Sequence, residues 1–157
     1  MIQRLRTIPL LVLTLGAPVV AFGVAAWQRR WMSDDGYIYL RVVDQVLAGN
    51  GPVFNRGERV EAATSPLWLW LISLFSAVLH GVPTSWIAVG LGLLLSLAGL
   101  AFAQWGAYRL WQRGKRRAVV PLGSLVIVAL PPFWDFATSG LETGRSEERR
   151  VGKECRL

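Results

Sequence analysis

The sequence predicts an all-α membrane protein, and three observations support this class. Hydrophobic residues make up 53% of the 157 positions and charged residues 17%, whereas soluble domains carry about 25% charged residues. The apolar residues form long uncharged runs in place of the alternating or 3.6-residue stripes of soluble elements. Basic residues gather between two of these runs, which is typical of a cytoplasmic loop and not of a nucleic-acid surface.

The first predicted transmembrane helix is 8–27. It contains no charge, and its length of about 30 Å as a helix is enough to cross the bilayer core. Arg4 and Arg6 precede it, which places the N-terminus in the cytoplasm. A cleaved signal peptide with a small-residue site near Ala25-Ala26 is the alternative. The later apolar segments favour an uncleaved anchor.

Two further spans are predicted at 86–105 and 118–134. Tryptophans at both ends of the first would anchor it at the membrane interfaces, and Gly90, Gly92 and Gly99 would let a neighbouring helix approach closely. The second is closed by Pro131-Pro132. The basic loop between these spans contains Arg109, Arg113, Lys115, Arg116 and Arg117.

The segment 67–79 is apolar but only about 20 Å long as a helix, too short to span. If it did span, the basic loop would lie outside, so we predict that it lies on or dips into the outer leaflet. The outer segment 28–85 then holds two membrane-surface helices, and its polar patch 33–65 shares a face with 135–142. Several arginines on this side depart from the positive-inside rule: Arg29, Arg30, Arg41, Arg56 and Arg59. Nearby acids offset them: Asp34, Asp35, Asp44, Glu58 and Glu61.

The acid pair Asp34-Asp35 is the first candidate for chemistry. Ser33 can cap a helix whose first turn holds both acids, which the helix dipole favours. The apolar stripe of this helix is Tyr39, Val42, Val43, Val46 and Leu47. Its polar face is Asp34, Tyr37, Arg41, Asp44 and Ala48. Gly49-Asn50-Gly51 would end the helix, with a glycine in the left-handed conformation.

Spacing alone leaves the role of these residues open. The acid pair could act as a general base, hold a divalent cation, or only favour the start of the helix. The run 56–61 could be a solvated, self-paired turn, or one of its arginines could bind a phosphate. No other cofactor is indicated, because the glycine-rich stretch 49–57 lacks nucleotide-binding spacing and His80 has no second histidine or cysteine pair as a metal partner.

The last 13 residues, 145–157, differ from the rest of the chain. They resemble the translation of library-adapter DNA, so we expect a non-native tail and a protein that continues beyond Gly144. The tail holds five of the 17 basic and three of the 10 acidic residues, which leaves a net charge of +5 in place of +7. It also holds the single cysteine, Cys155, so no intrachain disulfide is possible.

Three motifs resemble a known family. They are the acidic DDG at 34–36, the block AGNGPVFNRGERVEAATS at 48–65, and DFATSGLETG at 135–144. Together with the flanking residues of 27–68 they resemble the first periplasmic loop of GT-C glycosyltransferases, and among these the terminal β-(1→2)-arabinofuranosyltransferases of actinobacterial cell walls. The resemblance covers residues 8–144, and it implies that 1–144 is the N-terminal part of a GT-C transmembrane domain with three spans and two juxtamembrane helices.

The resemblance also implies a function. It predicts transfer of an arabinofuranosyl residue from decaprenyl-phospho-arabinofuranose to cell-wall arabinan, in arabinogalactan or lipoarabinomannan, at the outer face of the plasma membrane. Asp34 and Asp35 would be catalytic, with a divalent cation as a possible cofactor. The candidate donor- or acceptor-binding residues are Arg41, Arg56, Glu58, Arg59, Glu61, Ser139 and Glu142.

The family's enzymes are several hundred residues long, so we expect this chain to be inactive alone. A membrane scaffold or transporter subunit is the alternative. Transporters place polar residues inside their spans, whereas here they gather at one face.

Overall fold

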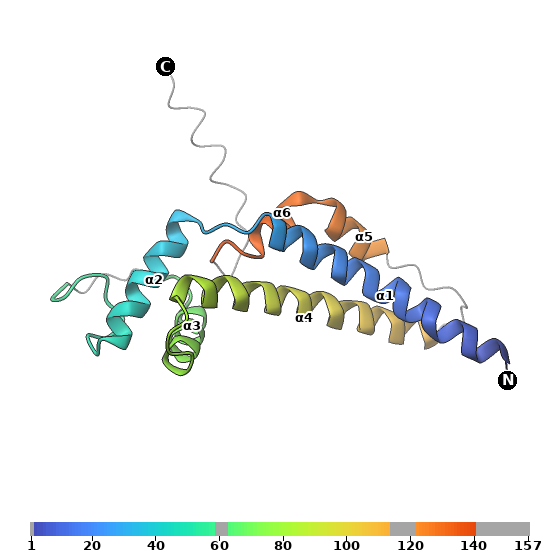
Figure 1. Ribbon diagram of the computed structural model, residues 1–157, viewed down its shortest axis with the longest axis horizontal. Helices are drawn as coiled ribbons and strands as arrows, with labels where there is room; N and C mark the ends of the chain where they lie inside the picture. Colours follow the sequence, from blue (N-terminus) through green and yellow to red (C-terminus); the bar gives the residue numbers. More distant parts are fainter. Residues whose placement is uncertain (1, 59–62, 114–121, 141–157) are drawn as a thin grey trace, which may run out of the picture.

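The computed structural model describes residues 2–58, 63–113 and 122–140, and within these ranges every regular element is an α-helix (Figure 1). The all-α prediction is therefore confirmed for the described residues. Predictions for Arg59, Glu61 and Glu142, and for the tail 145–157, lie outside the described residues.

Two long helices form the body of the molecule. Helices α1 (Ile2–Gln28) and α4 (Thr84–Arg113) lie side by side and antiparallel (Figure 1). The end of α1 meets the start of α4, where the ring centroids of Trp27 and Trp86 are 6.1 Å apart. Among the described residues, α4 is the one helix long and apolar enough to cross a membrane. The predicted segments 8–27 and 86–105 lie within these two helices.

The segment predicted as a third span is not one continuous helix. Its described part consists of α5 (Leu122–Ala129) and α6 (Pro131–Phe136), which pack against α1. Leu130 separates them in an extended conformation, with φ −98° and ψ 106°. Proline disfavours the helical conformation in the residue before it, so Pro131 ends α5 and begins α6.

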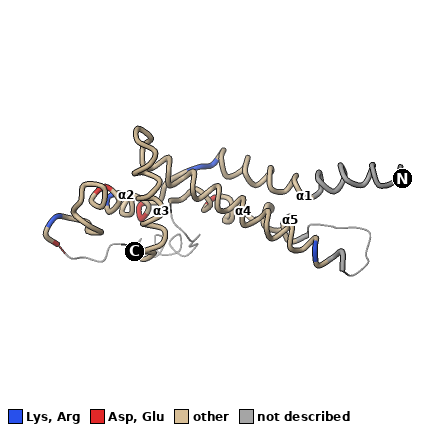
Figure 2. Tube along the Cα trace, turned by 90° about the horizontal axis from the view of Figure 1, so that it is seen from below, with Lys and Arg blue, Asp and Glu red and all other residues tan. Residues whose placement is uncertain are grey.

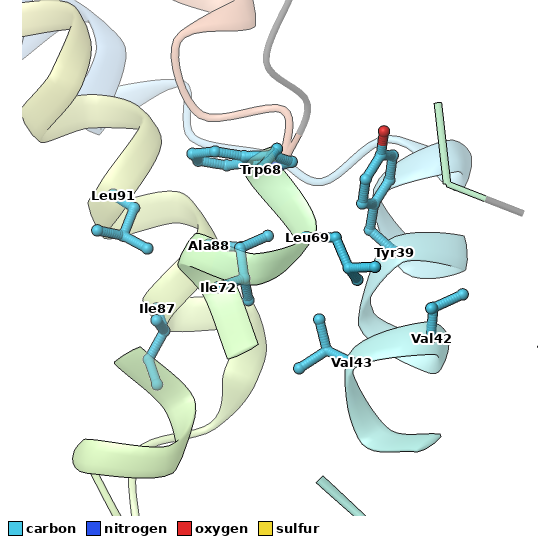
Figure 3. Packing of buried hydrophobic residues seen from close by; sticks show 9 residues of the cluster. All are labelled: Tyr39, Val42, Val43, Trp68, Leu69, Ile72, Ile87, Ala88 and Leu91. Carbon is cyan, nitrogen blue, oxygen red and sulfur yellow. The ribbon is translucent and has the colours of Figure 1, made fainter. Parts of the chain in front are cut away.

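Two shorter helices lie at the end of the body where α1 stops and α4 begins (Figure 1). Helix α2 (Asp34–Leu47) packs on α3 (Pro66–Val78), and α3 packs on α4. Figure 3 shows the buried cluster that joins them. Its members are Tyr39, Val42, Val43, Trp68, Leu69, Ile72, Ile87, Ala88 and Leu91. The first three residues of the apolar stripe predicted for the first outer helix, Tyr39, Val42 and Val43, therefore contact protein.

Charge is distributed unequally between the two ends of the body (Figure 2). All the acidic residues that the structure describes lie at the end that carries α2 and α3: Asp34, Asp35, Asp44, Glu58 and Asp135. Arg109 and Arg113 lie at the opposite end, in the last turns of α4. The fold thus gathers carboxylates at one end, as the predicted pairing of the two polar patches requires.

Candidate functional site

The acid pair occupies the first turn of α2, as predicted. Ser33 is the N-cap residue in an extended conformation, and its Oγ accepts a hydrogen bond from the Gly36 amide at 3.0 Å. Asp34 is exposed and Asp35 is half-buried. Acidic residues in the first turn of a helix interact favourably with the positive end of the helix dipole.

The polar face of α2 is exposed along its whole length. Asp34, Tyr37, Arg41 and Asp44 all lie on the surface, which confirms the predicted face. The apolar stripe is buried at Tyr39 and in the next turn, whereas Leu47 at its end is 45% exposed. A ligand approaching α2 from solvent would therefore meet two carboxylates and one guanidinium on the same surface.

The second polar patch contacts the start of α2 directly. The Ser139 carbonyl accepts two hydrogen bonds from Ser33, one from its amide at 2.9 Å and one from its Oγ at 3.0 Å. The Ser33 hydroxyl thus donates to Ser139 while it accepts from Gly36. We call the contact between residues 31–36 and 135–140 the Ser33–Ser139 junction. The described parts of the two polar patches, which were predicted to share one side of the membrane, are therefore in direct contact.

Two indoles extend the junction on either side. Trp31 Nε1 donates to the Asp135 carbonyl at 2.8 Å, and Trp68 Nε1 donates to the Gly140 carbonyl at 2.8 Å. Trp31 also contacts Phe136 edge-on, with ring centroids 5.9 Å apart. The segment 135–140 is therefore bonded to the residues before α2 and to the first turn of α3.

Three glycines let the chain segments approach this closely. A Cβ on Gly36 would lie 2.9 Å from the Ser139 carbonyl oxygen, and one on Gly92 would lie 2.7 Å from the Ala137 carbonyl oxygen. Gly140 has φ +84°, and a Cβ there would overlap Met32 Sδ. The close approach predicted for Gly92 is confirmed, although the neighbour is a turn and not a helix. Gly90 and Gly99 meet no neighbour within 4 Å.

Two of the predicted binding residues, Arg56 and Glu58, lie away from the acid pair (Figure 1). Arg56 and Glu58 lie in the loop after α2, which projects at the end of the molecule farthest from the N-terminus (Figures 1 and 2). This loop borders an open hollow of about 630 Å³, lined by Asn50, Val53, Arg56, Gly57 and Glu58. A helix of 14 residues is about 20 Å long, so α2 itself separates its acidic start from this loop.

Within the described ranges, the acid pair is not joined to an arginine and does not belong to a cluster of metal-binding side chains. There, no ion pair joins Asp34 or Asp35 to an arginine, and no three His, Cys, Asp or Glu side chains converge as a metal site would require. Ser139 is fully buried, and its Oγ donates to the Phe136 carbonyl at 3.0 Å. Its backbone, more than its side chain, contributes to the site.

Sequence reasoning missed Ser33 and Ser139 as partners. The N-cap role of Ser33 was predicted, but a backbone carbonyl that acts as an acceptor cannot be recognised from the types of residue. The available signal was the small-residue run Thr138-Ser139-Gly140, whose glycine permits the left-handed turn that presents these carbonyls.

Known proteins resemble this chain over 84% of its length. Two such relatives are named terminal β-(1→2)-arabinofuranosyltransferase: one from Mycobacterium tuberculosis, 48% identical over 135 residues, and one from Corynebacterium glutamicum, 46% identical over 132 residues. This confirms the resemblance inferred from the three motifs.

The chain spans only about a fifth of these relatives, 22% of the first and 19% of the second. No family model matches the sequence. No solved structure matches it either.

Proposed function

We propose that this chain is the N-terminal part of a GT-C enzyme. The whole enzyme would transfer an arabinofuranosyl residue from decaprenyl-phospho-arabinofuranose to cell-wall arabinan at the outer face of the membrane. The identity to the two arabinofuranosyltransferases carries this proposal. The acid pair, with Asp34 exposed and Asp35 half-buried at the charged end of an apolar helix body, agrees with it.

The chemistry is a displacement at the anomeric carbon of the donor sugar. Asp34 or Asp35 removes the proton of the acceptor hydroxyl as the new C–O bond forms and the bond to the lipid phosphate breaks. The phosphate departs with the bonding electron pair, and a guanidinium or a bound cation offsets its charge. Arg41 lies on the same exposed face as Asp34 and is the nearest described candidate along α2.

The proposed membrane arrangement follows from the same features. Helix α4 crosses the bilayer, α1 crosses beside it in the opposite direction, and α5 with α6 forms a third, broken crossing. The charged end that carries α2 and α3 faces outward. The bilayer then ends near Trp27 and Trp86, so Asp34 and Asp35 are within reach of a lipid-borne phosphate.

Substitution of the acids in the full-length enzyme tests the proposed chemistry. We expect Asp34→Asn or Asp35→Asn to reduce transfer of labelled arabinofuranose from the lipid donor by at least about 100-fold, because general-base catalysis contributes this much. Asp44→Asn is the matched control, since this residue shares the exposed face of α2 but lies near the other end of the helix. Its transfer rate should stay close to that of the wild type.

Wild-type rates in both Asp34→Asn and Asp35→Asn would contradict the catalytic assignment. We also expect this chain alone to be inactive, because most of the length of its relatives is absent from it. Measurable turnover by the chain would overturn that expectation.

A further inference from the structure

Two arginines at the end of α1 have no role in the proposed chemistry, yet the fold holds both in place. The Arg29 guanidinium lies over the Trp134 ring, 5.0 Å from its centroid. The Arg30 guanidinium lies 4.7 Å from the Trp27 centroid and 5.6 Å from the Trp86 centroid. Arg30 Nη1 also donates to the Trp27 carbonyl at 2.9 Å. Indoles from α1, α4 and α6 thus position two neighbouring positive charges.

Within residues 2–58, 63–113 and 122–140, no carboxylate forms an ion pair with either arginine, and both side chains are exposed. Each guanidinium has five N–H donors, and among these residues the two groups together donate one hydrogen bond, from Arg30. Stacking on indoles leaves the edges of the guanidinium groups available, and these edges match the geometry of a phosphate.

The position of Arg29 and Arg30 indicates that a phosphate bound by them would belong to a lipid. Tryptophans prefer the membrane interface, and Trp27, Trp86 and Trp134 gather where the two long helices meet. From Trp27 an exposed apolar stripe runs back along α1 through Val24 and Val20, which are 50% and 65% exposed. These three residues share one helix face, so an acyl chain can lie along them below the arginines.

We propose that Arg29 and Arg30, with the three indoles, form a binding site for the phosphate of an anionic membrane lipid. The site explains why two arginines depart from the positive-inside rule at this end of α1. It is separate from the acid pair and does not depend on the proposed transfer reaction.

Spin-labelled lipids provide the test with this chain as it stands. The chain is reconstituted in phosphatidylcholine vesicles, and the motionally restricted fraction of labelled phosphatidylglycerol is compared with that of labelled phosphatidylcholine. We expect a roughly tenfold preference for the anionic lipid, because each juxtamembrane arginine favours it several-fold. The double variant Arg29→Gln/Arg30→Gln should reduce the preference to about twofold or less.

Arg109→Gln is the matched control. The Arg109 guanidinium lies 5.0 Å from the Trp105 centroid, so this variant removes a similar stacked charge at the opposite end of α4. Its lipid preference should remain near that of the wild type. Retention of the preference in the double variant, or an equal loss in Arg109→Gln, would overturn the proposal.

Two further arms identify the ligand. Labelled decaprenyl phosphate should also show a motionally restricted fraction. The size of this fraction relative to that of labelled phosphatidylglycerol shows which lipid phosphate the site prefers. Inorganic phosphate should compete poorly, and competition equal to that of a short-chain phosphatidylglycerol would overturn the assignment to a lipid. Arg29→Lys/Arg30→Lys, which keeps both charges, should retain part of the preference, and far-UV circular dichroism confirms that each variant keeps its helices.

Discussion

The two ends of α2 are held in different ways. At its start, Ser33 bonds to Ser139, a residue 106 positions away, and Gly36 fits against the same carbonyl. At its other end the recorded hydrogen bonds are local, from Asn50 Nδ2 to Gln45 Oε1 and from Asn55 Nδ2 to Glu58 Oε2. Hydrogen bonds to a distant part of the chain therefore fix the acid pair, whereas the loop that carries Arg56 is held by local hydrogen bonds and by Phe54, which packs against the buried cluster of α2, α3 and α4.

The largest difference in stability between the two ends is expected when two glycines with the same backbone conformation, one at each end, are replaced by alanine. Gly140 has φ +84° and Gly57 has φ +86°, but of the two only Gly140 has neighbours within 4 Å of an added Cβ among the residues that the structure describes. Gly57→Ala should lower the free energy of unfolding by about 1–2 kcal/mol, because the only cost is that of placing an alanine in the left-handed conformation. Gly140→Ala should cost roughly 1–3 kcal/mol more, because its Cβ would also displace Met32.

The measurement is denaturant unfolding of both variants in the same detergent, followed by tryptophan fluorescence. Equal destabilisation by the two substitutions would mean that the Ser33–Ser139 junction does not constrain Gly140.

A smaller effect is expected from two serine N-caps. Ser33 Oγ accepts the Gly36 amide and donates to Ser139, whereas Ser65, the N-cap residue of α3, makes no side-chain capping bond. Ser33→Ala should therefore lose about 1–2 kcal/mol of stability, and Ser65→Ala should lose less than about 0.5 kcal/mol. Amide exchange at Gly36 should rise only in the first variant. Comparable losses of stability in the two variants would show that the hydrogen bonds of Ser33 in the junction do not stabilise the start of α2.

The smallest loss of stability is expected from a substitution at the C-terminal end of α2, where the hydrogen bonds are local. Asn50→Ala removes the bond to Gln45 Oε1 but leaves the Asn50 amide on the Gln45 carbonyl, so we expect a cost of at most about 1 kcal/mol. Exchange protection should fall around Gly49 and stay unchanged at Gly36. A loss of protection at Gly36 would indicate that the two ends of α2 are coupled.

The parts of the fold that depend on local chemistry could be predicted from the sequence. Ser33 marks the start of α2, Gly49 follows its end with φ +78°, and Pro66 begins α3. The charge pattern also predicted that the patches 33–65 and 135–142 share one side of the membrane, which agrees with the contact between their described parts. Each of these features depends on a side chain or a glycine that can be recognised by its type.

Features that depend on backbone acceptors or on mid-segment breaks could not be predicted. The residues 118–134 looked like one span because they are uniformly apolar, but Pro131 divides the described part into α5 and α6. Ser139 was predicted from the family resemblance to bind donor or acceptor, whereas in the structure its carbonyl oxygen is the acceptor for Ser33. The catalytic roles of Asp34 and Asp35 stay predictions that the substitutions above would test.

The Ser33–Ser139 junction also has a consequence for biogenesis. Chains are synthesised from the N-terminus, so α2 and its two carboxylates are made long before the carbonyl of Ser139 has been translated. Until then the first turn of α2 has only its own cap, and the acid pair is not held in its final place. The packing of α5 and α6 against α1 thus becomes a late folding step, which brings the Ser139 carbonyl to Ser33 and orders the start of α2.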